Sequence, residues 1–145
     1  MMRKSTSVVL SLLIIALVFS GCFFSVGLLA RLGETTWEYA VTLDGTVEAT
    51  GTMAFDKRTD FTTLSGTLTQ VSPKATTVVL HGRVDNQRNI TINHITLSAT
   101  EAVKFEGGVN ETNTLIKGVQ FYASDTTATP IQWYQGTWTA TKTSK

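Results

Sequence analysis

The chain has 145 residues, of which 42% are apolar and 16% charged, and this allows one domain with its own core rather than two. Twelve Lys and Arg residues face eleven Asp and Glu residues, so the formal net charge is +1, which excludes the basic face on which nucleic-acid binding depends. Threonine occurs 26 times, and because this β-branched residue favours strands, the composition indicates a β-protein of the secreted kind.

The first element is an apolar segment that follows two basic residues, Arg3 and Lys4. Residues 8–19, VVLSLLIIALVF, have the length of a signal-peptide core, and the sequence SGC comes directly after them. Two small residues followed by Cys22 resemble the lipobox of bacterial lipoproteins, with Phe19 at the position where that family usually has leucine. The resemblance implies cleavage before Cys22, diacylation of its thiol, and a mature protein tethered to a membrane by its acyl chains.

The same segment allows two other interpretations. The apolar run continues beyond Cys22, so residues 8–30 are uncharged and long enough for an uncleaved signal anchor. Cys22, the single cysteine of the chain, can also be an ordinary apolar side chain in a buried helix. The first two interpretations place the protein at the cell membrane or outer membrane, with everything after Gly33 in the periplasm or outside the cell. The expected organisation is a signal peptide (residues 1–21, or an anchor at 8–30), a tether (22–34) and a β-domain (35–145).

From residue 35 onward, apolar and polar side chains alternate with the period of two that is typical of strands. In TWEYAVTL, for example, Trp37, Tyr39, Val41 and Leu43 share one face, and the following Asp-Gly pair predicts a hairpin turn. The alternation slips between Ile92 and Ile95, which predicts a β-bulge. About eight strands are expected, at residues 36–43, 47–55, 61–71, 76–84, 90–99, 102–109, 115–123 and 131–141.

Glycines recur inside the predicted strands, in the sequences DGTV, TGTM, SGTL, HGRV, KGVQ and QGTW. A mid-strand glycine weakens a flat sheet and is tolerated where the sheet bends sharply or a large side chain crosses over it. This pattern, together with short sequential strands, predicts an antiparallel meander that closes or nearly closes into a barrel, with a β-sandwich as the alternative.

Aromatic residues mark both ends of the predicted domain, Trp37 and Tyr39 at its start, Trp133, Tyr134 and Trp138 at its end. In a closed sheet the first and last strands are neighbours, so these rings would cluster, either as a plug of the core or as a wall of a ligand site. We therefore take Trp37, Tyr39, Trp133 and Trp138 as candidate ligand-binding residues.

A meander barrel that opens on a strand with tryptophan is similar to the calycin group, which includes lipocalins, avidins and small barrel inhibitors. The signature of that group is Gly-x-Trp on the first strand, whereas here Thr35 precedes Trp37 and the GTW sequence, residues 136–138, lies on the last strand. The resemblance therefore concerns architecture, and it implies a barrel that can hold a small apolar ligand.

Motifs that carry chemistry are missing from the sequence. His81 and His94 lie on different predicted strands with no carboxylate at a metal-like spacing, and the chain has no nucleophile elbow, phosphate loop or dinucleotide fingerprint. We expect no enzyme, cofactor or metal. The expected function is a tethered extracytoplasmic binding protein, for a small apolar ligand or an envelope partner. The alternatives are a structural envelope lipoprotein and an inhibitor-type protein-binding module without a ligand pocket; a partner would be met by loops 56–60 or 124–130.

Overall fold

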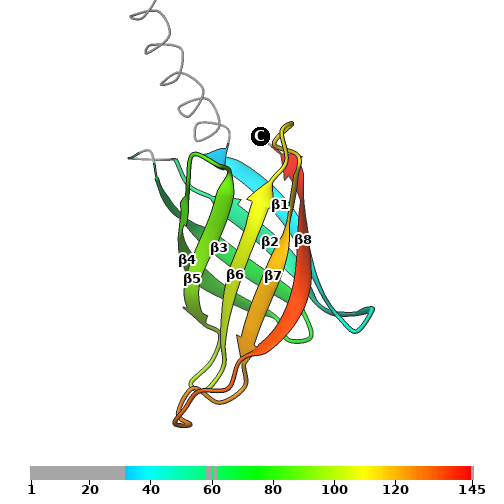
Figure 1. Cartoon of the computed structure of the whole chain (residues 1–145), viewed down its shortest axis with the longest axis vertical. Coiled ribbons are helices and arrows are strands. Elements are labelled where there is room, and N and C mark those ends of the chain that lie inside the picture. Colours follow the sequence, from blue (N-terminus) through cyan, green and yellow to red (C-terminus); the bar gives the residue numbers. More distant parts are fainter. Residues whose placement is uncertain (1–31, 58–59, 61, 145) are drawn as a thin grey trace, which may run out of the picture.

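The protein is an eight-stranded antiparallel β-barrel with meander topology (Figure 1). The computed structural model describes residues 32–57, 60 and 62–144. Each strand pairs with the next in sequence, and β1 pairs with β8 to close the sheet. The predicted barrel is thus confirmed over the sandwich. The strands are β1 Thr35–Leu43, β2 Thr46–Phe55, β3 Thr63–Ser72, β4 Thr76–Val84, β5 Asn89–Thr96, β6 Ala102–Val109, β7 Leu115–Ala123 and β8 Tyr134–Ser144.

The core fills the inside of the barrel with the apolar members of each alternating strand. On β1, Trp37, Tyr39 and Val41 are buried, as the sequence pattern predicted, whereas Leu43, expected on the same face, is 41% exposed at the end of the strand, beyond a shift of register after Val41. Closure brings β8 beside β1, with Val41 opposite Trp138. Leu32, just before β1, is also fully buried and belongs to the same cluster. The largest remaining core side chains are Met53, Leu64, Leu68, Leu80, Ile90, Ile92, Phe105 and Ile116.

The predicted bulge in β5 is confirmed, since the register with β6 shifts between Ile92 and Ile95. Further shifts occur in β1 between Val41 and Thr42, and in β2 between Thr50 and Gly51. Bulges increase the local twist of a strand, and strong twist is what allows a sheet of eight short strands to close on itself.

Two glycines show how the barrel admits its large rings. The ring of Tyr39 lies over Gly51, with its Cε1 2.8 Å from the place where a Cβ of residue 51 would be. The indole of Trp138 on β8 donates a hydrogen bond of 2.9 Å to the backbone carbonyl of Glu106 on β6, so it passes over the strand between them. The β7 residue directly opposite Trp138 is Gly118. Aromatic side chains therefore cross mid-strand glycines, as the sequence pattern predicted.

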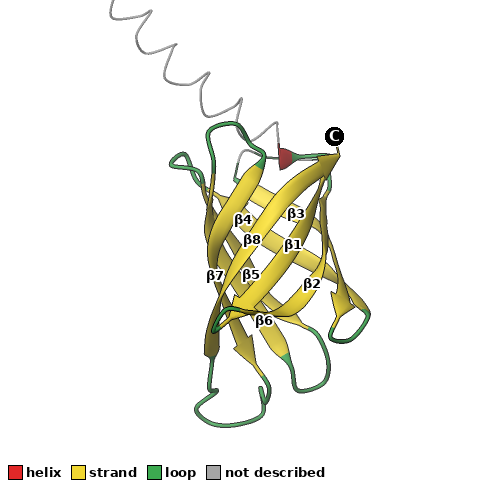
Figure 2. Ribbon diagram, turned by 90° about the vertical axis from the view of Figure 1, so that its right-hand side faces the viewer, coloured by secondary structure: helices red, strands yellow, loops and turns green. Residues whose placement is uncertain are grey.

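The two ends of the barrel differ (Figure 2). The chain enters β1 and leaves β8 at one end, which also carries the β2–β3, β4–β5 and β6–β7 connections. The other end carries only the four hairpin loops that join β1 to β2, β3 to β4, β5 to β6 and β7 to β8. We call these the chain end and the loop end. The predicted signal peptide, anchor and tether lie outside the described residues, apart from residues 32–34. In the part of the chain that is described, no helix is long and apolar enough to cross a membrane.

Candidate ligand-binding site

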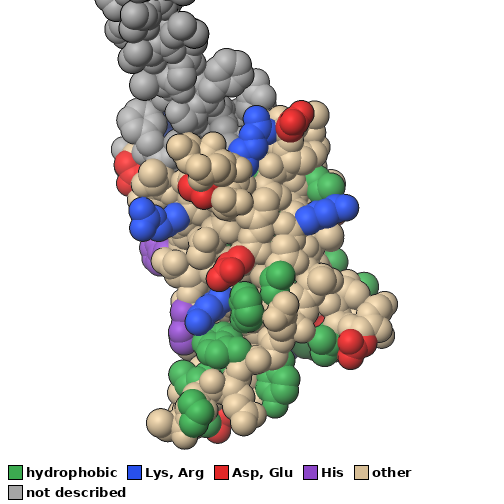
Figure 3. Space-filling view, in the orientation of Figure 1, with side chains coloured by type: hydrophobic (Ala, Val, Ile, Leu, Met, Phe, Trp, Pro, Cys, Tyr) green, Lys and Arg blue, Asp and Glu red, His purple; other side chains and the backbone are tan. Residues whose placement is uncertain are grey.

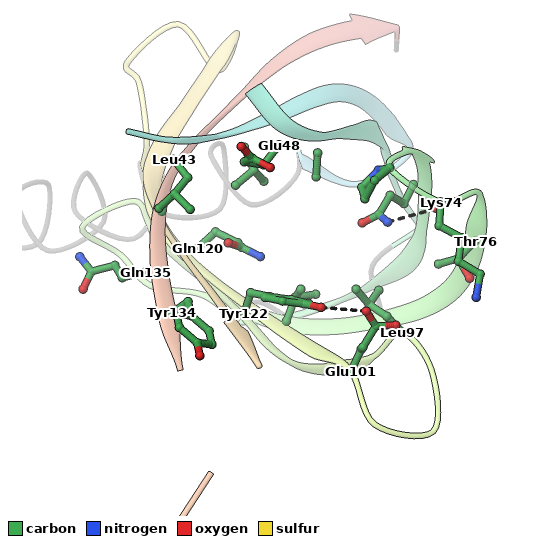
Figure 4. A pocket seen from close by; sticks show the side chains of 16 residues that line it. Leu43, Glu48, Lys74, Thr76, Leu97, Glu101, Gln120, Tyr122, Tyr134 and Gln135 are labelled. Atoms are coloured by element: carbon green, nitrogen blue, oxygen red, sulfur yellow. Dashed lines mark hydrogen bonds between the residues drawn. The ribbon is translucent and has the colours of Figure 1, made fainter. Parts of the chain in front are cut away.

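A cavity of about 380 Å³ occupies the loop end of the barrel (Figure 4). Its walls come from all parts of the sheet, because inward-facing residues near the loop end of each strand contribute to it. The lining residues are Val41, Leu43, Glu48, Ala49, Gln70, Pro73, Lys74, Thr76, Leu97, Glu101, Val103, Gln120, Tyr122, Tyr134, Gln135 and Gly136. The volume lies within the range of about 300–1,000 Å³ that is typical of small-molecule sites.

A layer of aromatic rings closes the cavity toward the chain end. Val41, Val103 and Gly136 line the cavity, and the next inward-facing residues on the same strands are Tyr39, Phe105 and Trp138. The rings meet edge to face, with centroids 5.8 Å apart for Tyr39 and Phe105 and 5.0 Å for Phe105 and Trp138. Burial raises the pKa of the Tyr39 phenol to about 12. This layer is a dense floor, so the cavity is a cup open at the loop end and not a channel.

One polar side chain projects into the cup from its wall. Gln120 faces inward from β7 and is only 7% exposed (Figure 4). It pairs in register with Phe105 on β6 and Gly136 on β8. The missing side chain at residue 136 leaves room for the amide, whose Oε1 is 3.8 Å from the position of a Cβ at Gly136. No described residue forms a hydrogen bond with the Gln120 side chain.

A hydrogen-bonded carboxylate, Glu101, lies at the mouth just before β6, the strand next to β7 (Figure 4). The hydroxyl of Tyr122 donates to Glu101 Oε1 at 2.7 Å, and the hydroxyl of Ser98 donates to Glu101 Oε2 at 2.9 Å. These two hydrogen bonds, that from Tyr122 first, lower the pKa of Glu101. The same contact and burial raise the pKa of Tyr122 to about 12. Glu101 is therefore ionised near neutral pH and its charge is already partnered.

The charged lining residues are Glu48, Lys74 and Glu101, which give the mouth a formal charge of −1. Glu48 and Lys74 are exposed, and the backbone carbonyl of Lys74 accepts a hydrogen bond of 3.1 Å from the Gln70 amide. The walls between the mouth and the floor are mainly aliphatic, from Val41, Ala49, Leu97 and Val103. A cup of this kind suits an apolar body with one or two polar groups.

Exposed apolar side chains gather around the loop end. Figure 3 shows them on the lower part of one face of the barrel. Five of the six large exposed apolar residues belong to the loop-end hairpins or to the strand residues beside them, and Val79 lies further along β4. Leu43 and Tyr134 also line the cavity, so this apolar rim is continuous with its wall. The rim residues are Leu43, Val47, Val71, Ile131 and Tyr134.

The structure brings three of the four predicted binding residues into the core and leaves the fourth outside. Tyr39 and Trp138 form part of the floor, just below the lining residues. Trp37 is fully buried nearer the chain end, where its indole donates to Thr35 Oγ1 at 2.9 Å and Thr35 donates to the carbonyl of Leu32. These three rings pack as a plug of the core, which was the alternative to a ligand wall.

Trp133 lies on the outer surface of the barrel. It precedes β8, and its ring contacts His94 edge to face at 5.5 Å while the Lys104 ammonium sits 4.0 Å above it. The long β7–β8 loop is thereby held against the outer faces of β5 and β6. None of Trp37, Tyr39, Trp133 and Trp138 is among the residues that line the cavity.

The remaining sequence predictions concern Cys22, the two candidate partner loops and metal binding. Cys22 lies outside the described residues. Loop 124–130 belongs to the loop end, near the mouth, whereas loop 56–60 belongs to the chain end. Within the described residues, no group of three or more His, Cys, Asp or Glu side chains is arranged to hold a metal ion.

Sequence reasoning missed Gln120 and the pair formed by Glu101 and Tyr122. The signal for Gln120 was its position on β7: it is an even number of residues from Ile116 and Tyr122, so all three side chains face inward.

No protein-family model matches the chain, and no curated protein or solved structure is significantly similar to it.

Proposed function

We propose that the protein is a non-catalytic extracytoplasmic binding protein that holds a small, largely apolar molecule in the cup at the loop end of its barrel. The observation that carries this proposal is the cavity itself, which combines aliphatic walls, a dense aromatic floor and a few polar groups. A barrel whose only role is structural gains stability from filling such a space with side chains, because empty apolar volume costs stability.

The orientation of the barrel supports the same proposal. The cup opens at the end opposite to the one where the chain enters, so a membrane tether at Cys22 would leave the mouth directed away from its attachment. The apolar rim that surrounds the mouth offers an apolar molecule a continuous path from the surface to the aliphatic walls.

A cavity-filling variant tests ligand binding. Ala49→Phe places a benzyl group in the cup, and we expect it to weaken binding of the apolar fluorophore N-phenyl-1-naphthylamine at least about tenfold. The matched control is Ala40→Phe, which makes the same change on the neighbouring strand but on its outward face, and should bind the dye like the natural protein. The full chain is used in lipid nanodiscs. Equal dye binding by all three proteins would show that the dye does not enter the cup and would refute the proposal.

The tether is a separate part of the proposal, and it rests on the sequence around Cys22. Mass spectrometry of the protein extracted from membranes is expected to show a chain that begins at Cys22 and carries the additional mass of acyl chains. An intact N-terminus would instead indicate the uncleaved signal anchor, and the protein would still be held at the membrane. Recovery of an intact, unmodified chain in the soluble fraction would refute both.

A second candidate function is the binding of an envelope protein through the apolar rim. The observation that favours it is the exposure of large aliphatic side chains there, 57% for Val47 and 65% for Val71. A double variant, Val47→Ser with Val71→Ser, is expected to abolish co-purification of such a partner while dye binding in the cup is retained. Capture of the same proteins by the double variant would exclude the rim as their docking site.

A further inference from the structure

The side chain of Gln120 has a buried position but no hydrogen-bond partner among the residues that the structure describes. It is 7% exposed and projects into the cup (Figure 4). The other two glutamines of the lining differ, because Gln70 donates to the carbonyl of Lys74 and Gln135 is exposed to solvent. Gln120 is therefore the one lining carboxamide, among the described residues, that is nine-tenths buried and forms no hydrogen bond with another described residue.

The surroundings of Gln120 show that the barrel makes room for its amide. Its cross-strand neighbour on β8 is Gly136, and a Cβ there would lie 3.5 Å from Val41 Cγ1 and 3.8 Å from Gln120 Oε1. The absence of a side chain at residue 136 thus leaves the carboxamide uncovered on that side. When the cup holds no ligand the amide faces solvent, and an apolar ligand would remove its water without replacing the hydrogen bonds, so a ligand that hydrogen-bonds the amide suits this wall better than a hydrocarbon.

The chemistry of the partner follows from the carboxamide itself. A glutamine side chain has a carbonyl acceptor and an NH₂ donor next to each other, and both are satisfied at once by a group that offers a donor beside an acceptor. A primary or secondary amide, a lactam and an imide all do so. An alcohol has a single oxygen and a hydrocarbon has no polar group, so neither can satisfy both ends of the carboxamide with the same geometry.

The charges at the cup select against an anionic head group. Two carboxylates, Glu48 and Glu101, and one ammonium, Lys74, line it. The Glu101 carboxylate accepts hydrogen bonds from Tyr122 and Ser98, and these, together with the charge of Lys74, keep it ionised at the mouth by lowering its pKa. A carboxylate ligand would have to pass this site, and it has no donor for the carbonyl oxygen of Gln120.

We propose that the ligand is an uncharged small molecule with an amide-type group, bound head first so that this group pairs with Gln120 while its apolar body lies against Val41, Leu97 and Val103. This inference rests on the proposed function, because it names the chemical class that the same cup selects. The head-first orientation places the apolar end of the ligand beside Leu43 and Tyr134 at the rim.

A matched series of eight-carbon ligands tests the class. Octanamide, octan-1-ol, octanoate and octylammonium each have eight carbons in a linear chain and differ in the polar group. The assay measures how well each ligand displaces N-phenyl-1-naphthylamine from the full-length protein in nanodiscs. The Ala49→Phe variant provides the background from dye in the lipid. We expect octanamide to bind about tenfold more tightly than the other three, which corresponds to about 1.4 kcal/mol. In Gln120→Leu the preference should fall to within about twofold, with dye binding retained. Gln87→Leu, the same change at an exposed glutamine in the β4–β5 turn at the chain end, should keep the preference.

Each outcome has a defined meaning. Equal affinity for the four ligands, or tighter binding of octanoate or octylammonium, overturns the choice of an amide while dye displacement still supports a binding cup. An unchanged preference in Gln120→Leu overturns the assignment of Gln120. A dye signal no larger than that of Ala49→Phe overturns the proposed function instead. If Gln120→Leu does not fold, the ligand order of the natural protein and the variant Gln120→Met decide the case.

Discussion

The crossing of Trp138 over Gly118 allows a sharp test of how the barrel is held together. Gly118 faces inward on β7, directly opposite Trp138 on β8 and Gly107 on β6. A Cβ at residue 118 would lie 2.5 Å from the Cα of Gly107 and even closer to the carbonyl oxygen of Glu106. That oxygen is the acceptor of the Trp138 indole. The substitution Gly118→Ala therefore forces either the backbone of β6 or the indole to move.

The cost can be estimated from the contacts at risk. A methyl group forced into a packed interior costs about 1–3 kcal/mol. Loss of the indole hydrogen bond adds roughly 1 kcal/mol, and the edge-to-face contact of Trp138 with Phe105 is weakened as well. Against this, replacing glycine by alanine lowers the entropy of the unfolded chain, which restores about 0.4–1 kcal/mol. We expect a net destabilisation of about 2–4 kcal/mol, or roughly 8–16 °C in Tm for a domain of this size.

The assay is thermal and urea unfolding followed by tryptophan fluorescence. Gly108→Ala is the matched control, because Gly108 lies on the adjacent strand and a Cβ there would meet nothing within 4 Å. Its stability should stay within about 0.5–1 kcal/mol of the natural protein. Equal stability of Gly118→Ala and Gly108→Ala would refute the argument that the indole needs a bare backbone at Gly118.

Two further predictions concern the mouth and the long loop. Because Tyr122 lowers the pKa of Glu101, the ionised carboxylate stabilises the fold above the ordinary glutamate pKa of 4.5, and this stabilisation is lost as the pH falls. The variant Tyr122→Phe should therefore show a smaller fall in Tm between about pH 7 and about pH 3 than the natural protein. The control variant Tyr134→Phe should show the same fall as the natural protein. Trp133→Ala removes the contacts that hold the β7–β8 loop to the outer surface, so amides of residues 125–132 should exchange hydrogen faster while those of the strands do not; unchanged exchange would show that the ring does not restrain the loop.

Closure of the barrel was predictable from two features of the sequence, short sequential strands and glycines such as Gly51 and Gly118 inside them. The glycines have a physical cause in the structure, because large rings inside a small barrel need bare backbone to pass over. The meeting of the first and last strands, each with a tryptophan, was expected as a consequence of closure. The N-terminal β-strand, its hairpin at Asp44–Gly45 and the bulge in β5 followed from the same local alternation.

The cup was less predictable, because its buried polar residue, Gln120, is of a type that usually faces solvent. Glutamine on a strand normally faces water, and the apolar residues Leu115, Val119 and Phe121 give β7 a competing alternation on the opposite face. Trp133 shows the converse error. Trp133 and Trp138 are separated by an odd number of positions, so the alternation along β8 directs their side chains to opposite faces of the sheet. The prediction that both rings face the interior considered only which strand they belong to and not this alternation.

The even number of strands has a consequence for engineering. An even meander returns the chain to the end at which it entered, so a fluorescent or affinity label fused behind β8 would sit at the chain end and leave the mouth unobstructed. Each of the four hairpins at the loop end joins neighbouring strands. The β7–β8 loop donates a backbone hydrogen bond of 2.8 Å from Thr126 to the carbonyl of Thr100 in the β5–β6 loop, so these two are best changed together. The β1–β2 and β3–β4 loops can be lengthened or randomised one at a time, and such changes leave the chain end of the barrel unaltered.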